Sequence, residues 1–200
     1  MNRPPKKFIN SDKSRVDRRV QKTKKLLSQA LIQLILEKGY ERVTVQDILD
    51  KANVARSTFY THYESKELLL VDGPRNLGLA LFDASPAEHD SGEHPMGFGR
   101  LFSHVSGSLP LAKAMLGRKG GNILMDSFRT QIGGAIREHY KARFPSGEKS
   151  RLVLSYLSQA SASAVCSLLT SWVDDDLSLP ADEMSLRCQR MLEAVFREFR

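Results

Sequence analysis

A series of short helices joined by tight turns is predicted over residues 18–70, and this pattern constrains the fold more than any other feature of the chain. The apolar residues that follow Arg18 recur with a helical period. The pattern stops at Gly39, the residue type that most easily adopts a left-handed conformation after a helix. Thr44 and Asp47 then have the spacing of a capping box, which predicts a short second helix.

A third helix is predicted from about Ala55 to His62, directly after a tight turn at Asn53-Val54. Asparagine enters left-handed conformations at low cost, so it suits a turn between two helices. Phe59 and Tyr63 lie four residues apart on one face of the third helix, and we expect both in the core. The remaining faces of this helix are left for solvent or a partner.

The rest of the chain also predicts helices and no strands, so the expected fold class is all-α. Ser65 can cap a fourth helix, which Gly73-Pro74 should kink or restart, because proline lacks an N–H and clashes with the preceding turn. A break at Gly120-Gly121 should precede a long helix capped by Asn122. The other expected helices cover residues 96–106, 110–116, 148–173 and 181–199.

The excess positive charge lies in the first third of the chain. Residues 1–66 contain 15 Lys and Arg against 7 Asp and Glu, whereas residues 67–200 contain 15 against 16. This separation is expected when one domain meets a polyanion and the other does not. We predict a mobile basic arm over residues 1–17, a nucleic-acid-binding domain over 18–66 and a larger regulatory domain over 67–200.

Patterns that would indicate an enzyme or a metal site are missing from the sequence. It has no nucleophile elbow, glycine-rich phosphate loop or paired catalytic carboxylates. Cys166 and Cys188 have no partner at metal-ligand spacing and are expected in the core. Glu88, His89 and Asp90 belong to a segment over 83–95 that predicts a hydrated loop. We therefore expect no catalytic residues, no metal and no cofactor.

No membrane-spanning or secretory segment is expected. The uncharged run over 152–173 contains too many Ser and Thr residues for a spanning helix and predicts a buried one. The first 25 residues are polar and basic, without the apolar core of a secretory signal. A cytoplasmic location is expected.

The three N-terminal helices together predict a DNA-binding helix-turn-helix. Arg56 at the start of the third helix offers a planar guanidinium suited to guanine O6 and N7. Small hydroxyl side chains beside it permit close approach to bases or phosphates. Tyr60 and Lys66 could hold the DNA backbone, which orients a protein without reading sequence.

Residues 18–70 resemble the N-terminal domain of TetR-family transcriptional regulators. The resemblance is carried, in order, by GYERVTVQDI at 39–48, ANVARSTFYTHY at 52–63 and SKELL at 65–69. It covers about a quarter of the chain. Asn53 and Ala55 depart from the family pattern, which usually has glycine in the turn and serine as the cap of the recognition helix.

The resemblance implies which residues meet DNA. Positions in the third helix approach bases or nearby phosphates, and positions around it contact phosphates. The matching residues are Arg56, Ser57, Thr58, Thr61 and His62 in the first group, and Thr44, Tyr60 and Lys66 in the second. His62 could instead be a plain surface residue, and Thr44 could serve only as a helix cap.

The resemblance also implies a homodimer, formed through the last two long helices, that binds a near-palindromic DNA operator. In this family a small-molecule effector in the C-terminal domain releases the DNA, and repression is the default. A mostly apolar effector pocket is expected among Phe98, Phe102, His104, Met115, Met125, Phe128 and Trp172. The alternative is a dimeric DNA-binding regulator without small-molecule control, whose C-terminal domain only dimerises or recruits a protein partner.

Overall fold

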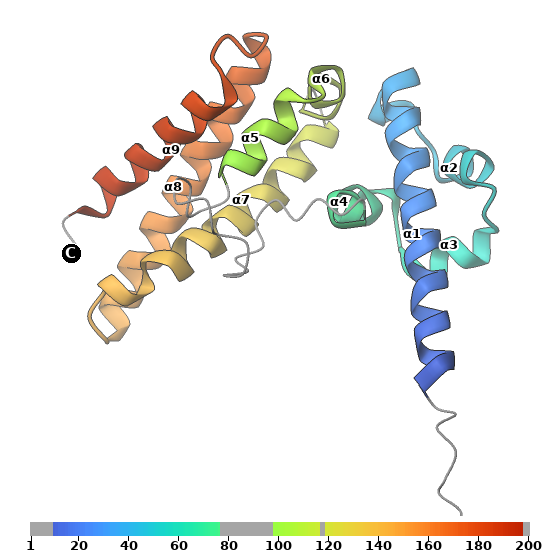
Figure 1. The fold of residues 1–200 in the computed structure, drawn as a ribbon, viewed down its shortest axis with the longest axis horizontal. Helices are drawn as coiled ribbons and strands as arrows, with labels where there is room; N and C mark the ends of the chain where they lie inside the picture. The colour runs from blue at the N-terminus through green and yellow to red at the C-terminus, as the bar shows by residue number, and fades with distance from the viewer. Residues whose placement is uncertain (1–9, 77–97, 117–118, 198–200) are drawn as a thin grey trace, which may run out of the picture. The chain divides into compact units, whose positions relative to one another are not determined.

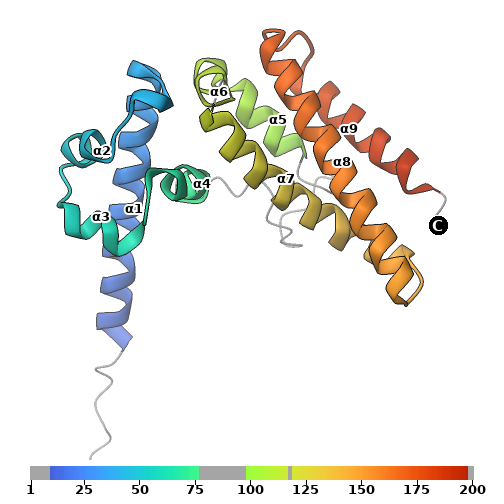
Figure 2. The same ribbon diagram turned by 180° about the vertical axis from the view of Figure 1, so that it is seen from behind.

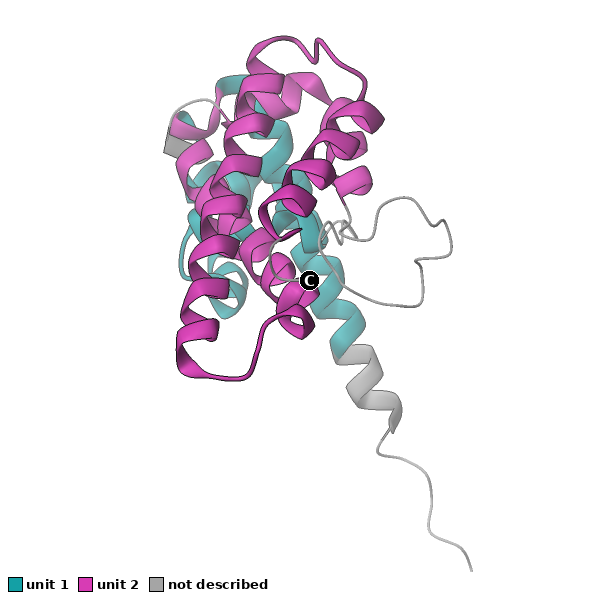
Figure 3. Ribbon diagram, turned by 90° about the vertical axis from the view of Figure 1, so that its left-hand side faces the viewer, with its two compact units in different colours: residues 1–38, 42–79 teal, residues 39–41, 80–200 magenta. Residues whose placement is uncertain are grey.

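The computed structural model describes residues 10–76, 98–116 and 119–197, and these residues form helices and turns without a strand. The chain divides into two compact units, residues 1–38 with 42–79 and residues 39–41 with 80–200 (Figure 3). The predicted all-α class is confirmed.

The first unit is built around one long helix. Figures 1 and 2 show α2 and α3 on one side of α1 and α4 on the other. Its α-helices are α1 (Asn10–Lys38), α2 (Val45–Ala52), α3 (Arg56–His62) and α4 (Lys66–Asn76), and the short helix η1 (Tyr40–Arg42) follows α1 in the chain. Their shared core is apolar, and its most deeply buried members are Leu27, Leu31, Ile35, Ile48, Phe59 and Leu69.

Helix α1 begins earlier than its apolar pattern indicated. It starts at Asn10, so residues 10–17 of the predicted arm belong to this helix. Asn10 and Asp12 are residue types that favour helix starts, and no proline or glycine follows before Gly39. The extension carries few apolar residues, so the apolar pattern did not predict it.

Helix α4 runs through Gly73-Pro74 to Asn76, so it does not restart there. Pro74 lies in the last turn, where its missing N–H removes one hydrogen bond near the end of the helix. Leu69 and Leu70 on α4 are buried, and α4 belongs to the first unit. The boundary between the units therefore falls later than residue 66.

The second unit contains a long antiparallel helix pair, α7 and α8, with α5 packed on α9 and α6 on α7 and α8 (Figure 2). Residues 83–95, predicted as a loop, lie outside the described residues. The elements are α5 (Phe98–Ser106), α6 (Leu109–Leu116), α7 (Lys119–Tyr140), η3 (Lys141–Arg143), α8 (Glu148–Asp174) and α9 (Ala181–Val195).

The predicted break at Gly120-Gly121 is wrong, because α7 already begins at Lys119 and Asn122 therefore lies inside it. A Cβ at Gly121 would lie 2.2 Å from the carbonyl oxygen of Leu116. Glycine at this position allows the first turn of α7 to approach the end of α6. The signal that suggested a helix break therefore marks a close contact between helices.

By length and composition alone, α8 would be able to cross a membrane. In the structure α8 packs against α7, α6 and α9. Val165, Leu169 and Val173 are fully buried along it, and Trp172 is nearly so. The prediction of a buried helix over 152–173 therefore holds for one face of α8, whereas Leu152 and Tyr156 are exposed.

Candidate nucleic-acid interface

The start of α2 is fixed by a complete capping box. The Thr44 hydroxyl accepts a hydrogen bond from the Asp47 N–H at 3.1 Å, and the Thr44 N–H donates to Asp47 Oδ2 at 2.7 Å. Lys38 Nζ lies 2.8 Å from the same carboxylate oxygen. The Lys38 ammonium and the Thr44 donors hold the pKa of Asp47 well below its usual range. The predicted cap is confirmed, and an ion pair also joins it to the end of α1.

The turn between α2 and α3 has the predicted left-handed residue. Asn53 has φ 53° and ψ 50°, and its N–H donates to the Asp50 carbonyl. The Val54 N–H donates to the Leu49 carbonyl at 3.1 Å, which closes the end of α2. The turn is therefore short and closed by two backbone hydrogen bonds, and it sets the direction of α3.

One face of α3 is anchored in the core and the opposite face is open. Phe59 is 0% exposed and Tyr63 is 4% exposed, with ring centroids 6.0 Å apart. The Tyr60 ring lies edge-on to Phe59 and is 49% exposed. These contacts confirm the expected core face and orient α3 so that one side faces solvent. That open side carries Arg56, Ser57, Tyr60 and Thr61.

Arg56 is held from α2 by a side-chain relay that sequence reasoning missed. Its Nη2 donates to Gln46 Oε1 at 2.9 Å, and Gln46 Nε2 donates to Asp50 Oδ1 at 2.8 Å. Gln46 and Asp50 are four residues apart on one helix, a spacing that allows their side chains to pair, so this half of the relay could be predicted from the sequence. The link to Arg56 depends on how α2 and α3 pack, and no local pattern gives that.

The other predicted side chains of α3 differ in their hydrogen bonds and in their exposure to solvent. The Thr61 hydroxyl donates to the Ser57 carbonyl at 2.9 Å and keeps its lone pairs for an incoming donor. Ser57 is exposed, whereas Thr58 and His62 are half-buried. The six predicted residues of α3 thus lie on one helix, with four of them on its solvent face.

Lys66 and Thr44, both predicted to contact DNA phosphates, make hydrogen bonds within the protein. Lys66 Nζ donates to the Val43 carbonyl at 2.7 Å and is partly buried. The exposed Thr44 side chain is occupied by the cap. Lys24 of α1 pairs with Asp72 of α4 at 3.6 Å. Lys66 therefore joins α4 to the segment before α2, and Lys24 joins α1 to α4.

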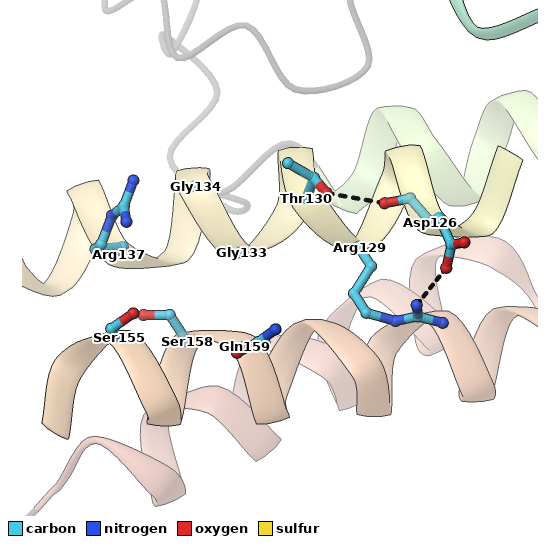
Figure 4. A pocket seen from close by; sticks show the side chains of 9 residues that line it. All are labelled: Asp126, Arg129, Thr130, Gly133, Gly134, Arg137, Ser155, Ser158 and Gln159. Atoms are coloured by element: carbon cyan, nitrogen blue, oxygen red, sulfur yellow. Dashed lines mark hydrogen bonds and ion pairs between the residues drawn. The ribbon is translucent and has the colours of Figure 1, made fainter. Parts of the chain in front are cut away.

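Two of the seven residues predicted to line an effector pocket, Phe102 and Trp172, pack on each other in the second unit. Phe102 and Trp172 meet edge to face with centroids 5.2 Å apart, and the Trp172 Nε1–H donates to the Leu179 carbonyl at 2.8 Å. Phe98, Met125 and Phe128 are also buried, and His104 and Met115 are half-buried. Burial lowers the pKa of His104. A groove between α7 and α8 (Figure 4) is lined by other residues and includes none of the seven.

Comparison with known proteins places the N-terminal region in a described family. Residues 27–72 match the family model described as bacterial regulatory proteins, tetR family. The chain is 45% identical over 56 residues to the uncharacterized HTH-type transcriptional regulator YxbF of Bacillus subtilis, which is 28% of this chain and 15% of that protein. It is 32% identical over 63 residues to DhaS of Lactococcus lactis, a transcriptional activator of the dhaKLM operon, covering 32% and 30% of the two chains.

The fold of the whole chain also has a solved counterpart. A TetR transcriptional regulator from Streptococcus agalactiae 2603V superposes with a TM-score of 0.61 at 25% identity, over 90% of this chain and 98% of that one. The matches to YxbF and DhaS span less than a third of those proteins. The similarity in sequence is therefore concentrated in the helices that carry the candidate interface.

Proposed function

Since this chain belongs to the TetR family of bacterial regulatory proteins, we propose that it binds a specific double-stranded DNA operator in the cytoplasm and regulates transcription there. The comparisons are to DNA-binding regulators and not to enzymes. Under this proposal α3 enters the major groove and the regulatory role belongs to the second unit.

The observation that carries the proposal is the open face of α3. Phe59 and Tyr63 fix the helix, so Arg56, Ser57, Tyr60 and Thr61 are presented together to solvent. Arginine can bond guanine in two places at once, and short hydroxyl side chains allow the helix to come close. The charge excess of residues 1–66 supplies attraction to the phosphates.

Selection of bound sequences from random DNA duplexes by the purified full chain tests the proposal. We expect one enriched motif, repeated as an inverted pair, and binding that weakens steeply as salt rises. Arg56→Ala should lose preference at one position of the motif. Failure to bind any duplex at low salt would overturn the proposal.

We propose that the protein acts as a homodimer through α8 and α9. Leu152 is 48% exposed and Tyr156 is 65% exposed on α8, and Leu186 is 39% exposed on α9. Large apolar side chains that remain in water on two long helices support a partner surface. Sedimentation should give a dimer for the native chain and a monomer for Tyr156→Asp. A monomeric native chain at micromolar concentration would contradict this part.

We further propose that the protein is a repressor released by a small-molecule effector bound near the seven sequence-predicted residues. Trp172 is the single tryptophan of the chain and packs on Phe102 there. An effector in this cluster has to separate the two rings, so it should change tryptophan fluorescence and release the operator together. Compounds of mostly apolar character are the first to test.

A regulator without small-molecule control is the second candidate, and the close packing of Phe102 on Trp172 favours it. DhaS is described as a transcriptional activator, so activation instead of repression is also to be tested. A reporter gene behind the selected operator separates these cases. Repression relieved by a fluorescence-active compound supports the first proposal, whereas constant repression supports the second and increased expression contradicts repression.

A further inference from the structure

A groove of about 450 Å³ runs between α7 and α8, apart from the apolar cluster around Trp172. Its volume falls within the range usual for small-ligand sites. Figure 4 shows Ser155, Ser158 and Gln159 on the side of α8 that faces α7, with Arg137 at one end and Arg129 toward the other. The lining is therefore rich in hydrogen-bonding side chains.

Several of these side chains have no partner among the residues that the structure describes. The Ser158 hydroxyl is buried and unbonded, in a residue only 2% exposed. Other hydroxyls nearby use the carbonyl one turn back: Ser163 donates to Gln159 and Thr130 to Asp126, both at 3.0 Å. A buried hydroxyl without a partner is unfavourable, so Ser158 is ready to bond a polar ligand.

The charges of the groove are unequal at its two ends. Arg129 Nη1 donates to Asp126 Oδ1 at 2.6 Å, so that guanidinium is already compensated. Arg137 is exposed and makes no ion pair within the described part of the chain. A guanidinium with free donors binds a carboxylate through two parallel hydrogen bonds. The Arg137 end is therefore the one suited to an anion.

One of the two glycines of α7 in the lining, Gly134, borders open space. A Cβ at Gly134 would meet nothing within 4 Å, and a Cβ at Gly133 would lie 3.6 Å from the Ala162 Cβ. Neither position has the left-handed backbone that requires glycine. Glycine disfavours a helix interior, yet Gly134 leaves open space in the lining, whereas Gly133 lies where α7 approaches Ser158 and Ala162 of α8. The open stretch is suited to the body of a small molecule.

We propose that this groove binds a small hydroxylated carboxylate, with the carboxylate at Arg137 and the hydroxyl groups at Ser155, Ser158 and Gln159. The unpaired cation selects an anion. The neutral hydroxyl and amide groups select a body that both donates and accepts hydrogen bonds. The inference concerns binding to the second unit and does not depend on the proposed action on DNA.

Calorimetric titration of the full chain with gluconate tests the proposal. Hexanoate keeps the carboxylate without hydroxyls, sorbitol keeps the hydroxyls without charge, and inorganic phosphate supplies an oxyanion alone. We expect gluconate to bind at least tenfold more tightly than each of the other three. Equal binding of phosphate would assign a simple oxyanion site and overturn the proposal, as would absence of gluconate binding.

Variants then locate the site. Arg137→Gln should weaken gluconate at least tenfold, whereas Lys149→Gln, the same charge change at an exposed site on α8 outside the lining, should have no effect. Gly134→Leu should fill the groove and abolish binding. Ser158→Ala should weaken binding several-fold while the melting temperature stays equal or rises, because the unbonded hydroxyl is removed. Unchanged gluconate affinity in Arg137→Gln and Gly134→Leu would refute the site.

Two further readouts separate this inference from the proposed function. Gluconate in the groove should leave the fluorescence of Trp172 unchanged, whereas a ligand in the apolar cluster should alter it. Binding with altered fluorescence that persists in Gly134→Leu would place the ligand in the cluster and overturn the groove assignment. Failure of the chain to bind DNA would contradict the proposed function and leave the titration result intact.

Discussion

Replacement of Gln46 by alanine should weaken sequence discrimination without removing a predicted DNA contact. Gln46 accepts a hydrogen bond from Arg56 Nη2 at 2.9 Å and is itself held by Asp50 at 2.8 Å. Without this relay the arginine regains rotamer freedom, which it must lose again when it binds a base. Under the proposed function, Gln46 is therefore a positioning residue for Arg56.

The expected magnitude follows from the exposure of these groups. Interactions between exposed charged or polar side chains contribute about 0.5–1 kcal/mol, so Gln46→Ala should lower affinity for the selected operator about 2–5-fold. Removal of the guanidinium in Arg56→Ala should cost about 1–3 kcal/mol at one base pair. The smaller loss of affinity in Gln46→Ala should depend on the same base pair that Arg56→Ala affects.

Fluorescence anisotropy with the operator and its single-base variants provides the assay, for both single variants and the double variant. If Gln46 acts through Arg56, the double variant should bind like Arg56→Ala alone. Gln33→Ala, at an exposed glutamine of α1, is the matched control. An additive double variant, or an equal loss on every duplex, would refute the relay and would indicate that Gln46 contacts DNA itself.

Three other predictions follow from the first unit. Ala55→Ser should add the side-chain cap that α3 lacks and raise the free energy of unfolding by ~1 kcal/mol in urea titrations, and a decrease would contradict this. Lys66→Met should lower stability by about 0.5–1.5 kcal/mol through the lost bond to Val43, and thermal melts with Lys25→Met as the control should reveal it. Because the folded-state pKa of Asp47 is lowered, its contribution is present above the unfolded pKa of about 3.9 and is lost as pH falls below it. Asp47→Asn should flatten the stability profile in that acidic range, and an unchanged profile would argue against the cap as its cause.

Local sequence signals predicted α2 and α3 well, because the interactions that form these helices act between residues close together in the sequence. Thr44 with Asp47, Asn53, and the pair Phe59 and Tyr63 each act over one turn or less, and the structure has all of them as expected. The orientation of α3 follows from these elements. That orientation left Arg56 on the open face, as its place in the pattern indicated.

Features that depend on packing between helices were not visible in the sequence. Gly121 suggested a helix end and instead permits contact with Leu116. Lys66 had the chemistry of a phosphate contact, but its ammonium bonds the Val43 carbonyl across the unit. The groove beside Gly134 also escaped prediction, because it arises where two helices separated by a turn face each other. Such features need the three-dimensional arrangement.

The attachment of α4 to the first unit determines where this protein can be divided. Lys66 and Asp72 bond to groups outside α4, and Leu69 and Leu70 are buried. A fragment that stops at residue 65 would expose the apolar side of α1 to water and lose both bonds. The shortest fragment that we expect to fold independently therefore extends through residue 79, and truncation studies of the DNA reader should begin from that length.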